Sequence, residues 1–445
     1  MSELRRRWAT AADTDALVVF TADVLRHQDA PAPDACTGAW TRDLMTGRHP
    51  RFVPSDFSIV EDVASGEIVS SACLISQTWS FDGIPIAVGQ PELIGTHPDR
   101  RRQGLVREQF EALHRRSVER GQQLLAIDGV PHFYRQFGYE MALERLGGVV
   151  LQAGRLPEVD SPMFSVREAI GADLPFIATA ARHAARRSLL TCDRDEGLWQ
   201  YELYGRDPMN FYRTELRTIT TRDGRPVGYL AHAHHTARLA GATLVLYACE
   251  TLDVDWADVV PTLLAYLRAT GLRYASIHGD DFRYVGLWMG TTHPLYAALG
   301  QLAPQMAPPY AWYIRVHDLA AFLRHIAPVL ERRLAESAWR DFSGELRLGF
   351  YRGGVSLVFA DGRLASAVPW QQSERLLGVE RLQPTTAERA DAFLPELTVL
   401  QLLCGYRSLD ELQHAFPDCL VRTDRVHALL TTLFPRRPSS VWPAV

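Results

Sequence analysis

The chain has 445 residues, 47% of them hydrophobic and 22% charged, and a formal net charge of −5. Because a single hydrophobic core rarely grows beyond about 250–300 residues, this length predicts two or three domains. The slightly acidic balance argues against a nucleic-acid-binding protein, which is normally basic. The chain contains no lysine, which excludes both a phosphate-binding P-loop and a lysine Schiff base.

The sequence shows no sign of a membrane segment, a secretion signal or a disulfide framework. No apolar run approaches the about 18–20 residues that span a bilayer, and no apolar stretch follows the charged N-terminus. The 6 cysteines are scattered and form no Cys-x-x-Cys pair, which is typical of reduced thiols. His232, His234 and His235 lie close together, but no further ligand completes a metal site. We therefore expect a cytoplasmic protein with no membrane segment and no metal.

Two residue pairs each occur twice along the chain, and the two copies of each pair are separated by almost the same number of positions. Both copies of the first pair precede a helical pattern. The pairs are Arg7 and Asp13 with Arg167 and Asp173, 160 positions apart, and Tyr134 and Gly138 with Tyr296 and Gly300, 162 positions apart. A nearly constant offset between two separate signatures predicts a duplicated domain.

An arginine-rich turn in the first half of the chain precedes a predicted helix. An apolar strand ends near Ile94, arginines follow a proline, and helical spacing then begins after Gly104 and stops at Gly121. The first turn of a helix has unpaired backbone N–H groups and the positive end of the dipole, so it attracts anions. A glycine there lets phosphates approach the backbone closely. The turn is therefore a candidate diphosphate site, although similar turns also occur in ordinary strand-to-helix connections.

The helix is followed by a short apolar strand, 124–127, and by the aromatic sequence Phe133-Tyr134-Arg135-Gln136-Phe137-Gly138-Tyr139. With this segment the sequence resembles the GNAT acyltransferase superfamily. Arg101-x-x-Gly104-x-Val106 is similar to that family's coenzyme A pyrophosphate loop, with Val106 where glycine or alanine is usual. The aromatic segment resembles the one that closes the family's acetyl site. The resemblance implies that acetyl-CoA is bound by Ile94, Gly95, Thr96, Arg102, Gln103, Gly104, Leu105, Val106, Arg107 and Gly129.

The later parts of the chain depart from this pattern. The second copy lacks the phosphate turn, because residues 262–268 form an amphipathic helix with no glycine or arginine turn ahead of it. Beyond Val316, a helical pattern over 319–330 leads to two alternating strands, 345–350 and 355–359, and a turn at 360–363 predicts a hairpin. With its further helices, this last block is predicted to be α+β.

This arrangement resembles the Eis-type (enhanced intracellular survival) acetyltransferases, which have two GNAT units and a sterol-carrier-like domain. The implied fold is α/β plus α+β, in which each GNAT unit has a mixed central sheet flanked by helices. The implied domains are a catalytic GNAT unit over 1–150, a degenerate GNAT-like unit over 151–316 and a sterol-carrier-like domain over 317–445. The resemblance also implies a hexameric homo-oligomer and a C-terminal carboxylate that enters the active site.

Three residues are candidates for the chemistry of acetyl transfer. Tyr134 stands at the family's catalytic tyrosine position, and a phenol with a pKa near ~10 can donate a proton to a thiolate. The alternative for Tyr134 is a packed core aromatic. The base remains open between Glu92, which could equally form a half-buried salt bridge, and the terminal carboxylate of Val445. Trp79 and Phe81 are expected either to line the acceptor pocket or to pack in the core.

The resulting hypothesis is an acetyl-CoA-dependent N-acetyltransferase. Its acceptor would be a primary amine of a small molecule, similar to an aminoglycoside or a polyamine, or a lysine side chain. The alternative is a non-catalytic acyl-CoA-binding sensor or scaffold with a GNAT-like fold. Neither a nucleic acid nor a membrane is an expected partner.

Overall fold

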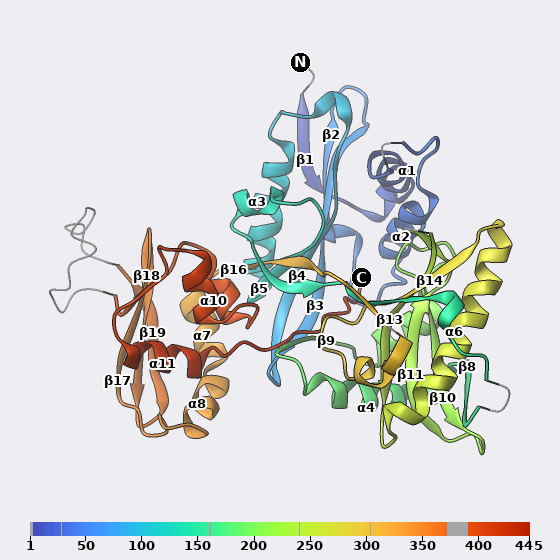
Figure 1. Ribbon diagram of the computed structural model, residues 1–445. Helices are drawn as coiled ribbons and strands as arrows, with labels where there is room; N and C mark the ends of the chain where they lie inside the picture. The colour runs from blue at the N-terminus through green and yellow to red at the C-terminus, as the bar shows by residue number, and fades with distance from the viewer. Residues whose placement is uncertain (1–2, 28, 160–161, 240, 303, 372–389) are drawn as a thin grey trace.

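The computed structural model describes residues 3–27, 29–159, 162–239, 241–302, 304–371 and 390–445. Two mixed sheets with flanking helices form the larger part of these residues, and a smaller α+β block stands at one side (Figure 1). The fold class is therefore α/β plus α+β, as predicted. Among the helices of these ranges, none combines the length and the apolar character needed to cross a membrane.

The first sheet has eight strands within the described residues, and only β4 and β5 run parallel. Its strands in spatial order are β1 (Leu4–Trp8), β2 (Phe57–Asp62), β3 (Ile68–Phe81), β4 (Ile84–Thr96), β5 (Leu124–Ile127), β16 (Tyr310–Val316) and β6 (Glu140–Arg145), with β9 (Leu190–Asp193) paired to β3. Its helices are α1 (Thr14–Val24), α2 (Ala35–Met45), α3 (Leu105–Glu119) and the short 3-10 helix η4 (Phe133–Phe137).

Helices cover both faces of the first sheet because the side chains of its strands alternate. On β3, Cys73 and Ile75 join the buried cluster that contains residues of α1 and α2. Ala72 and Leu74 belong instead to the cluster that contains residues of α3. The two-residue period of a strand thus divides β3 between two cores.

The second sheet repeats the strand order of the first, again with one parallel pair, β13 and β14. Its strands in spatial order are β8 (Phe164–Glu168), β10 (Thr214–Thr221), β11 (Pro226–Ala233), β13 (Ala242–Thr251), β14 (Phe282–Leu287), β7 (Gly148–Gln152) and β15 (Gln305–Ala307), with β12 (Ala237–Arg238) paired to β13. Its helices are α4 (Leu174–Ala185), α5 (Glu196–Gln200), α6 (Trp256–His278) and the 3-10 helix η8 (Pro294–Leu302).

The recurring arginine and aspartate make the same contact in both units. Arg7 pairs with Asp13 at 2.7 Å between Nη2 and Oδ1, and Arg167 pairs with Asp173 at 2.8 Å between the same atoms. In each case the pair ties the first strand of a unit to the start of its first helix. The repeated sequence signature therefore corresponds to a repeated structural contact.

The two sheets exchange one strand each. The residues of each sheet therefore do not follow the predicted domain boundaries at 150/151 and 316/317. Strand β7 follows β6 directly in the chain, yet it pairs with β14 and β15 of the second sheet. Strand β16 crosses in the other direction and pairs between β5 and β6. An apolar strand fits either sheet by its local pattern, so only the tertiary packing decides its partner.

The third block contains a five-stranded sheet within the described residues and helices packed beside it. Its strands are β19 (Arg363–Trp370), β18 (Gly353–Ala360), β17 (Gly344–Phe350), β20 (Ala392–Phe393) and β21 (Leu420–Val421), and its helices are α7 (Leu319–His325), α8 (Ala327–Ala335), α9 (Thr398–Leu403), α10 (Leu409–Ala415) and α11 (Asp424–Leu433). The predicted hairpin is present as β18 and β19. The single helix predicted over 319–330 is divided at Ile326, because Pro328 near the start of α8 cannot continue the hydrogen bonding of α7.

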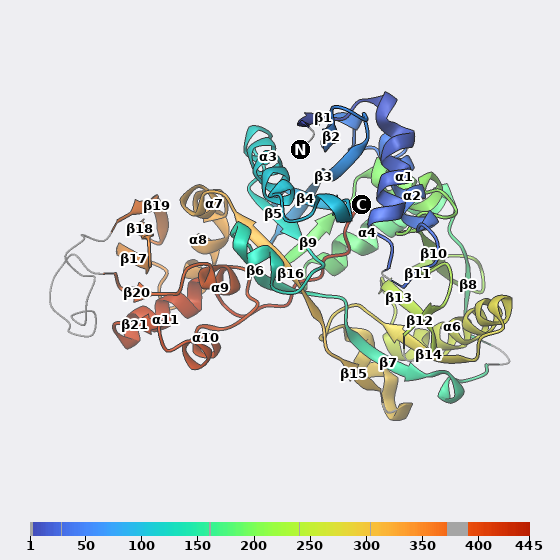
Figure 2. The same ribbon diagram turned by 90° about the horizontal axis from the view of Figure 1, so that it is seen from above.

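After α11, the chain leaves the third block and returns to the centre of the molecule. Figures 1 and 2 both show the C-terminus where the first and second units meet. Ser440 donates its backbone N–H to the Leu190 carbonyl oxygen at 3.0 Å, which places the tail beside β9. We call residues 438–445 the C-terminal tail. The tail connects all three parts of the protein.

Candidate active site

The site begins where the two parallel strands of the first sheet separate. Ladder pairs join β4 and β5 only at Val88–Leu124 and Gly89–Leu125 within the described residues. Farther along β4, Leu93 and Ile94 together stand opposite one residue of β3, and Leu93 has a φ of +50°. Such a bulge bends a strand and increases its twist. The end of β4 therefore diverges from β5 and leaves backbone groups available for a ligand.

The predicted diphosphate turn lies between the end of β4 and α3. Gly104 is the residue before α3 and has a φ of +82°, which favours glycine. A side chain built there would meet no atom within 4 Å, so the space in front of the turn is open. Arg102, Gln103 and Arg107 are exposed around it. The free N–H groups of the first helical turn and these arginines fit a diphosphate.

The other residues predicted to bind the coenzyme lie along the open end of β4. Ile94 is half-buried, whereas Gly95 and Thr96 are buried. The Ser70 hydroxyl donates to the Gly95 carbonyl oxygen at 2.9 Å and lies 3.0 Å from the Thr96 hydroxyl. A Cβ on Gly95 would lie 2.9 Å from Val24 of α1, so the glycine is required there by close packing. Leu105 and Val106 begin α3 beside this end of the strand.

Tyr134 lies in η4 with only 7% of its surface exposed. Gly129 has a φ of +128°, and a side chain there would lie 2.9 Å from the Tyr134 hydroxyl oxygen. The tyrosine ring makes edge contacts with several aromatic neighbours, including Tyr313 of β16. Burial raises the pKa of Tyr134 above its usual range, and the Glu92 carboxylate raises it further. The phenol therefore keeps its proton and lies within electrostatic reach of Glu92.

Glu92 projects from the diverging part of β4 and is half-buried. Gln90 donates to its Oε1 at 2.6 Å. Burial raises the pKa of the Glu92 carboxyl, and the nearby Asp128 raises it further. A carboxyl with a raised pKa can accept a proton near neutral pH, which is what a general base requires.

Asp128 and Arg145 belong to the same cluster, and the sequence analysis missed both. Asp128 follows the last residue of β5, and Arg145 donates from Nε to its carboxylate at 2.6 Å. Arg145 also lies over the Trp312 ring, 4.9 Å from its centroid. The available signal was the position of Asp128 directly after a buried parallel strand, since ligands in α/β proteins gather at the carboxyl ends of such strands.

The C-terminal residue lies inside the first unit. Val445 has no exposed surface and belongs to the buried cluster that includes Trp40, Cys73 and Leu93. His49 Nδ1 accepts from the Arg51 backbone, so its Nε2 carries the proton and donates to the Ala444 carbonyl oxygen at 3.3 Å. Burial and the nearby Arg206 lower the pKa of His49 to about 4, which keeps this imidazole neutral.

Trp79 and Phe81 have no exposed surface and belong to the large core that joins the first unit to the third block. The Trp79 ring packs edge-on against Trp312, and the Phe81 ring packs edge-on against Phe322. Of the two roles expected for these residues, packing in the core is therefore the one observed.

The first unit matches a known domain family. Residues 5–142 match the family model described as an acetyltransferase (GNAT) domain. No curated protein matches the chain.

Several solved structures match the chain over its whole length. A GCN5-related N-acetyltransferase from Anabaena variabilis matches with a TM-score of 0.65 and 13% identity, over 99% of both chains. A conserved protein of unknown function from Enterococcus faecalis, a probable N-acyltransferase, has a TM-score of 0.66 and 13% identity, over 99% of this chain and 100% of that chain. Eis1 from Mycobacterium abscessus has a TM-score of 0.59 and 14% identity, over 100% of both chains. Residues 5–142 thus match a GNAT acetyltransferase domain, and the chain as a whole shares its fold with these structures.

Proposed function

We propose that this protein transfers the acetyl group of acetyl-CoA to a primary amine by direct attack of the amine on the thioester. The acceptor is a small molecule or a lysine side chain. The observation that carries the proposal is the placement of Tyr134, whose buried hydroxyl lies against Gly129 at the separation of β4 and β5 and within electrostatic reach of Glu92.

The coenzyme would be held by backbone groups and arginines of the first unit. Its diphosphate would lie against Arg102–Arg107, which include the exposed turn and the first turn of α3. Its pantetheine arm would follow Ile94, Gly95 and Thr96 along the open end of β4 toward Gly129. Val106 fits this role because only its backbone N–H is required there.

The transfer itself requires two proton movements. The amine nitrogen attacks the thioester carbonyl carbon, a C–N bond forms and the C–S bond breaks. Tyr134 gives its proton to the departing thiolate, which suits a phenol that remains protonated at neutral pH. A carboxylate accepts the proton that the amine loses.

Two carboxylates could take the amine proton. Glu92 has a raised pKa, which makes it a stronger base than an ordinary glutamate. The Val445 carboxylate is carried on a buried residue, and the ion pairs found among the described residues do not include it. A buried anion without a cationic partner is costly, so a substrate ammonium would be attracted to it.

The second unit would not bind the coenzyme. Asp253, Asp255 and Asp258 lie between the end of β13 and the first turn of α6, where the first unit has its arginine turn. Three carboxylates at that position would repel a diphosphate.

The proposal is tested with the purified full-length chain in two steps. Acetyl-CoA should raise the melting temperature, and a panel of primary amines should then release free coenzyme A thiol. If acetyl-CoA bound but no amine of the panel caused release of the coenzyme A thiol, the result would favour an acyl-CoA sensor instead. Absence of any thermal shift would contradict the proposal at the first step.

A further inference from the structure

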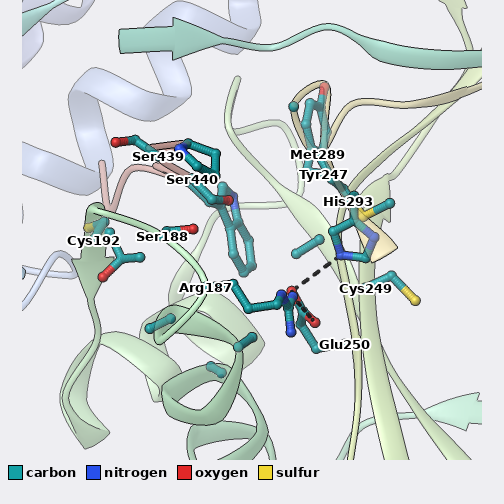
Figure 3. A pocket seen from close by; sticks show the side chains of 18 of the residues that line it. Arg187, Ser188, Cys192, Tyr247, Cys249, Glu250, Met289, His293, Ser439 and Ser440 are labelled. Atoms are coloured by element: carbon teal, nitrogen blue, oxygen red, sulfur yellow. Dashed lines mark hydrogen bonds and ion pairs between the residues drawn. The ribbon is translucent and has the colours of Figure 1, made fainter. Parts of the chain in front are cut away.

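The second unit contains the same separation of strands as the first, but here it opens into a cavity. The parallel ladder between β13 and β14 ends at Leu246–Leu287, and Trp288 donates its N–H to the Leu246 carbonyl oxygen just beyond this pair. A cavity of about 320 Å³ lies at this opening, enclosed by β13, the end of α4 and the C-terminal tail (Figure 3). Its volume is at the lower end of the range for small-molecule sites.

One wall of the cavity is polar and is held rigidly. Arg187 donates from Nη2 to both carboxylate oxygens of Glu250, at 2.8 and 2.7 Å. His293 Nδ1 accepts from the Leu295 backbone, so Nε2 carries the proton and donates to Glu250 at 3.3 Å. Figure 3 shows these three side chains meeting at one side of the cavity. The Glu250 carboxylate is therefore already occupied by donors.

Hydrogen-bond donors remain free on this side of the cavity. The Tyr229 side chain is only 3% exposed, yet among the described residues no hydrogen-bond partner of its hydroxyl is found. Among the described residues, Arg187 donates hydrogen bonds only from Nη2. The hydrogens on its Nε and Nη1 therefore remain available to a ligand. Arg187 is exposed toward the cavity, so an acceptor oxygen of a ligand can bond to these donors without displacing a protein partner.

Another part of the cavity wall is apolar and is partly made by the tail. Trp442 of the tail and Met289 line it, together with Ala178 and Ala181 of α4. The Arg194 guanidinium covers Trp442, 3.9 Å from the ring centroid. This surface suits a flat apolar body rather than a second charged group.

The remaining acids on the wall do not create a cation site. Glu144 is occupied by Thr291, which donates to it from both its backbone N–H and its hydroxyl. Asp193 is directly followed by Arg194; burial raises the pKa of the Asp193 carboxyl, and this arginine opposes the rise. With Glu250 also occupied, the Tyr229 hydroxyl and the remaining guanidinium hydrogens of Arg187 are donors that stay available to a ligand.

We propose that this cavity is a second binding site that takes a small carboxylate with a flat apolar body. The carboxylate would accept hydrogen bonds from the Tyr229 hydroxyl and the Arg187 guanidinium, and the body would lie against Trp442 and Met289. This site does not depend on acetyl transfer in the first unit.

The test is calorimetric titration of the full-length chain with three probes of similar shape that are not amine acceptors: benzoate, benzamide and benzyl alcohol. Acetyl-CoA is present at saturation so that the coenzyme site of the first unit is filled. Benzoate should bind saturably, and benzamide and benzyl alcohol, which lack the carboxylate charge, should bind more weakly. Tyr229→Phe should weaken benzoate binding roughly ten-fold, because a hydrogen bond to a charged group is lost. Tyr284→Phe, in β14 but outside the cavity, should leave it unchanged.

A second variant separates loss of the site from loss of the fold. Ala181→Phe should fill the cavity and abolish benzoate binding while the melting temperature stays within a few degrees of the wild-type value. The Gly104→Glu variant, altered only in the first unit, should still bind benzoate, which distinguishes this site from the acyl site. Binding of benzamide as tight as that of benzoate, or benzoate binding that Tyr229→Phe and Ala181→Phe leave unchanged, would overturn the proposal.

Discussion

Arg194 donates a hydrogen bond from Nη2 to the carbonyl oxygen of Pro443 at 3.0 Å. Its guanidinium also stacks on Trp442 and lies 3.5 Å from the buried Glu202 carboxylate. One arginine that directly follows β9 thus holds the last part of a tail that comes from the third block and ends in the first unit. The position of Val445 therefore depends on contacts made by all three parts of the chain.

The tail prediction is that deleting residues 442–445 lowers turnover, because the terminal carboxylate no longer reaches the first unit. Arg194→Met should have a smaller effect of the same kind, since it removes the hydrogen bond to Pro443 and leaves the tail present. Steady-state kinetics with the best amine of the panel measure both effects. Wild-type turnover in the deletion variant would remove Val445 from the mechanism and leave Glu92 as the base.

Release of Val445 by a carboxypeptidase, followed by mass spectrometry, reports on the tail without using activity. Release should be slow in the wild-type chain and faster in Arg194→Met. Arg238→Met removes an exposed arginine that pairs with Asp280 away from the tail, so it should behave like the wild type.

The coenzyme prediction is that Gly104→Glu abolishes binding of acetyl-CoA. A negative side chain would stand in front of the first turn of α3, where the diphosphate would lie, and its Coulomb repulsion would add to the backbone strain. Gly66→Glu is the matched control, because Gly66 also has a positive φ, +72°, and open space around it, but lies in the turn between β2 and β3. Calorimetry should show lost affinity in the first variant alone. Equal affinity in both would reject the assignment of the turn.

The acid prediction is that Tyr134→Phe lowers turnover by roughly ten-fold to ten-thousand-fold with little change in the affinity for acetyl-CoA. The hydroxyl supplies the proton that the thiolate needs, whereas the ring supplies most of the packing. Tyr139→Phe is the control within the same aromatic cluster, since that hydroxyl bonds to His114 instead. If both variants kept wild-type turnover, Tyr134 would be a packing residue.

The pH prediction concerns Glu92. Its pKa in the folded chain is raised above the ordinary value of 4.5, so between these two values the folded state binds more protons than the unfolded state. The free energy of unfolding must therefore decrease as the pH rises through that window, by at most about 1.4 kcal/mol per pH unit. Glu92→Gln removes this contribution, so its stability relative to the wild type should increase as the pH rises above 4.5.

Urea denaturation at a series of pH values measures this difference. A constant difference between Glu92→Gln and the wild type across the series would show that Glu92 is not perturbed. The same variant tests the choice of base, because turnover that is unchanged at every pH would leave the amine proton to Val445.

Several features of this protein could be predicted from local sequence because local physics determines them. The turn before α3 could be predicted because a glycine with positive φ, neighbouring arginines and helical spacing all lie within about ten residues. The repeat could be predicted because the Arg7–Asp13 and Arg167–Asp173 pairs each join residues six positions apart. The short helix that carries Tyr134 could be predicted because the aromatic segment around it resembles the one in the GNAT family.

Other features were decided only by the tertiary structure, because they depend on residues far apart in the chain. The exchange of β7 and β16 between the sheets has no local signal, since a buried strand satisfies its pattern in either place. The charged cluster of Glu92, Asp128 and Arg145 forms because the interior of β4 lies near the ends of β5 and β6, which no spacing in the sequence records. The cavity beneath the tail exists for the same reason: its walls come from the second sheet, from α4 and from the last residues of the chain.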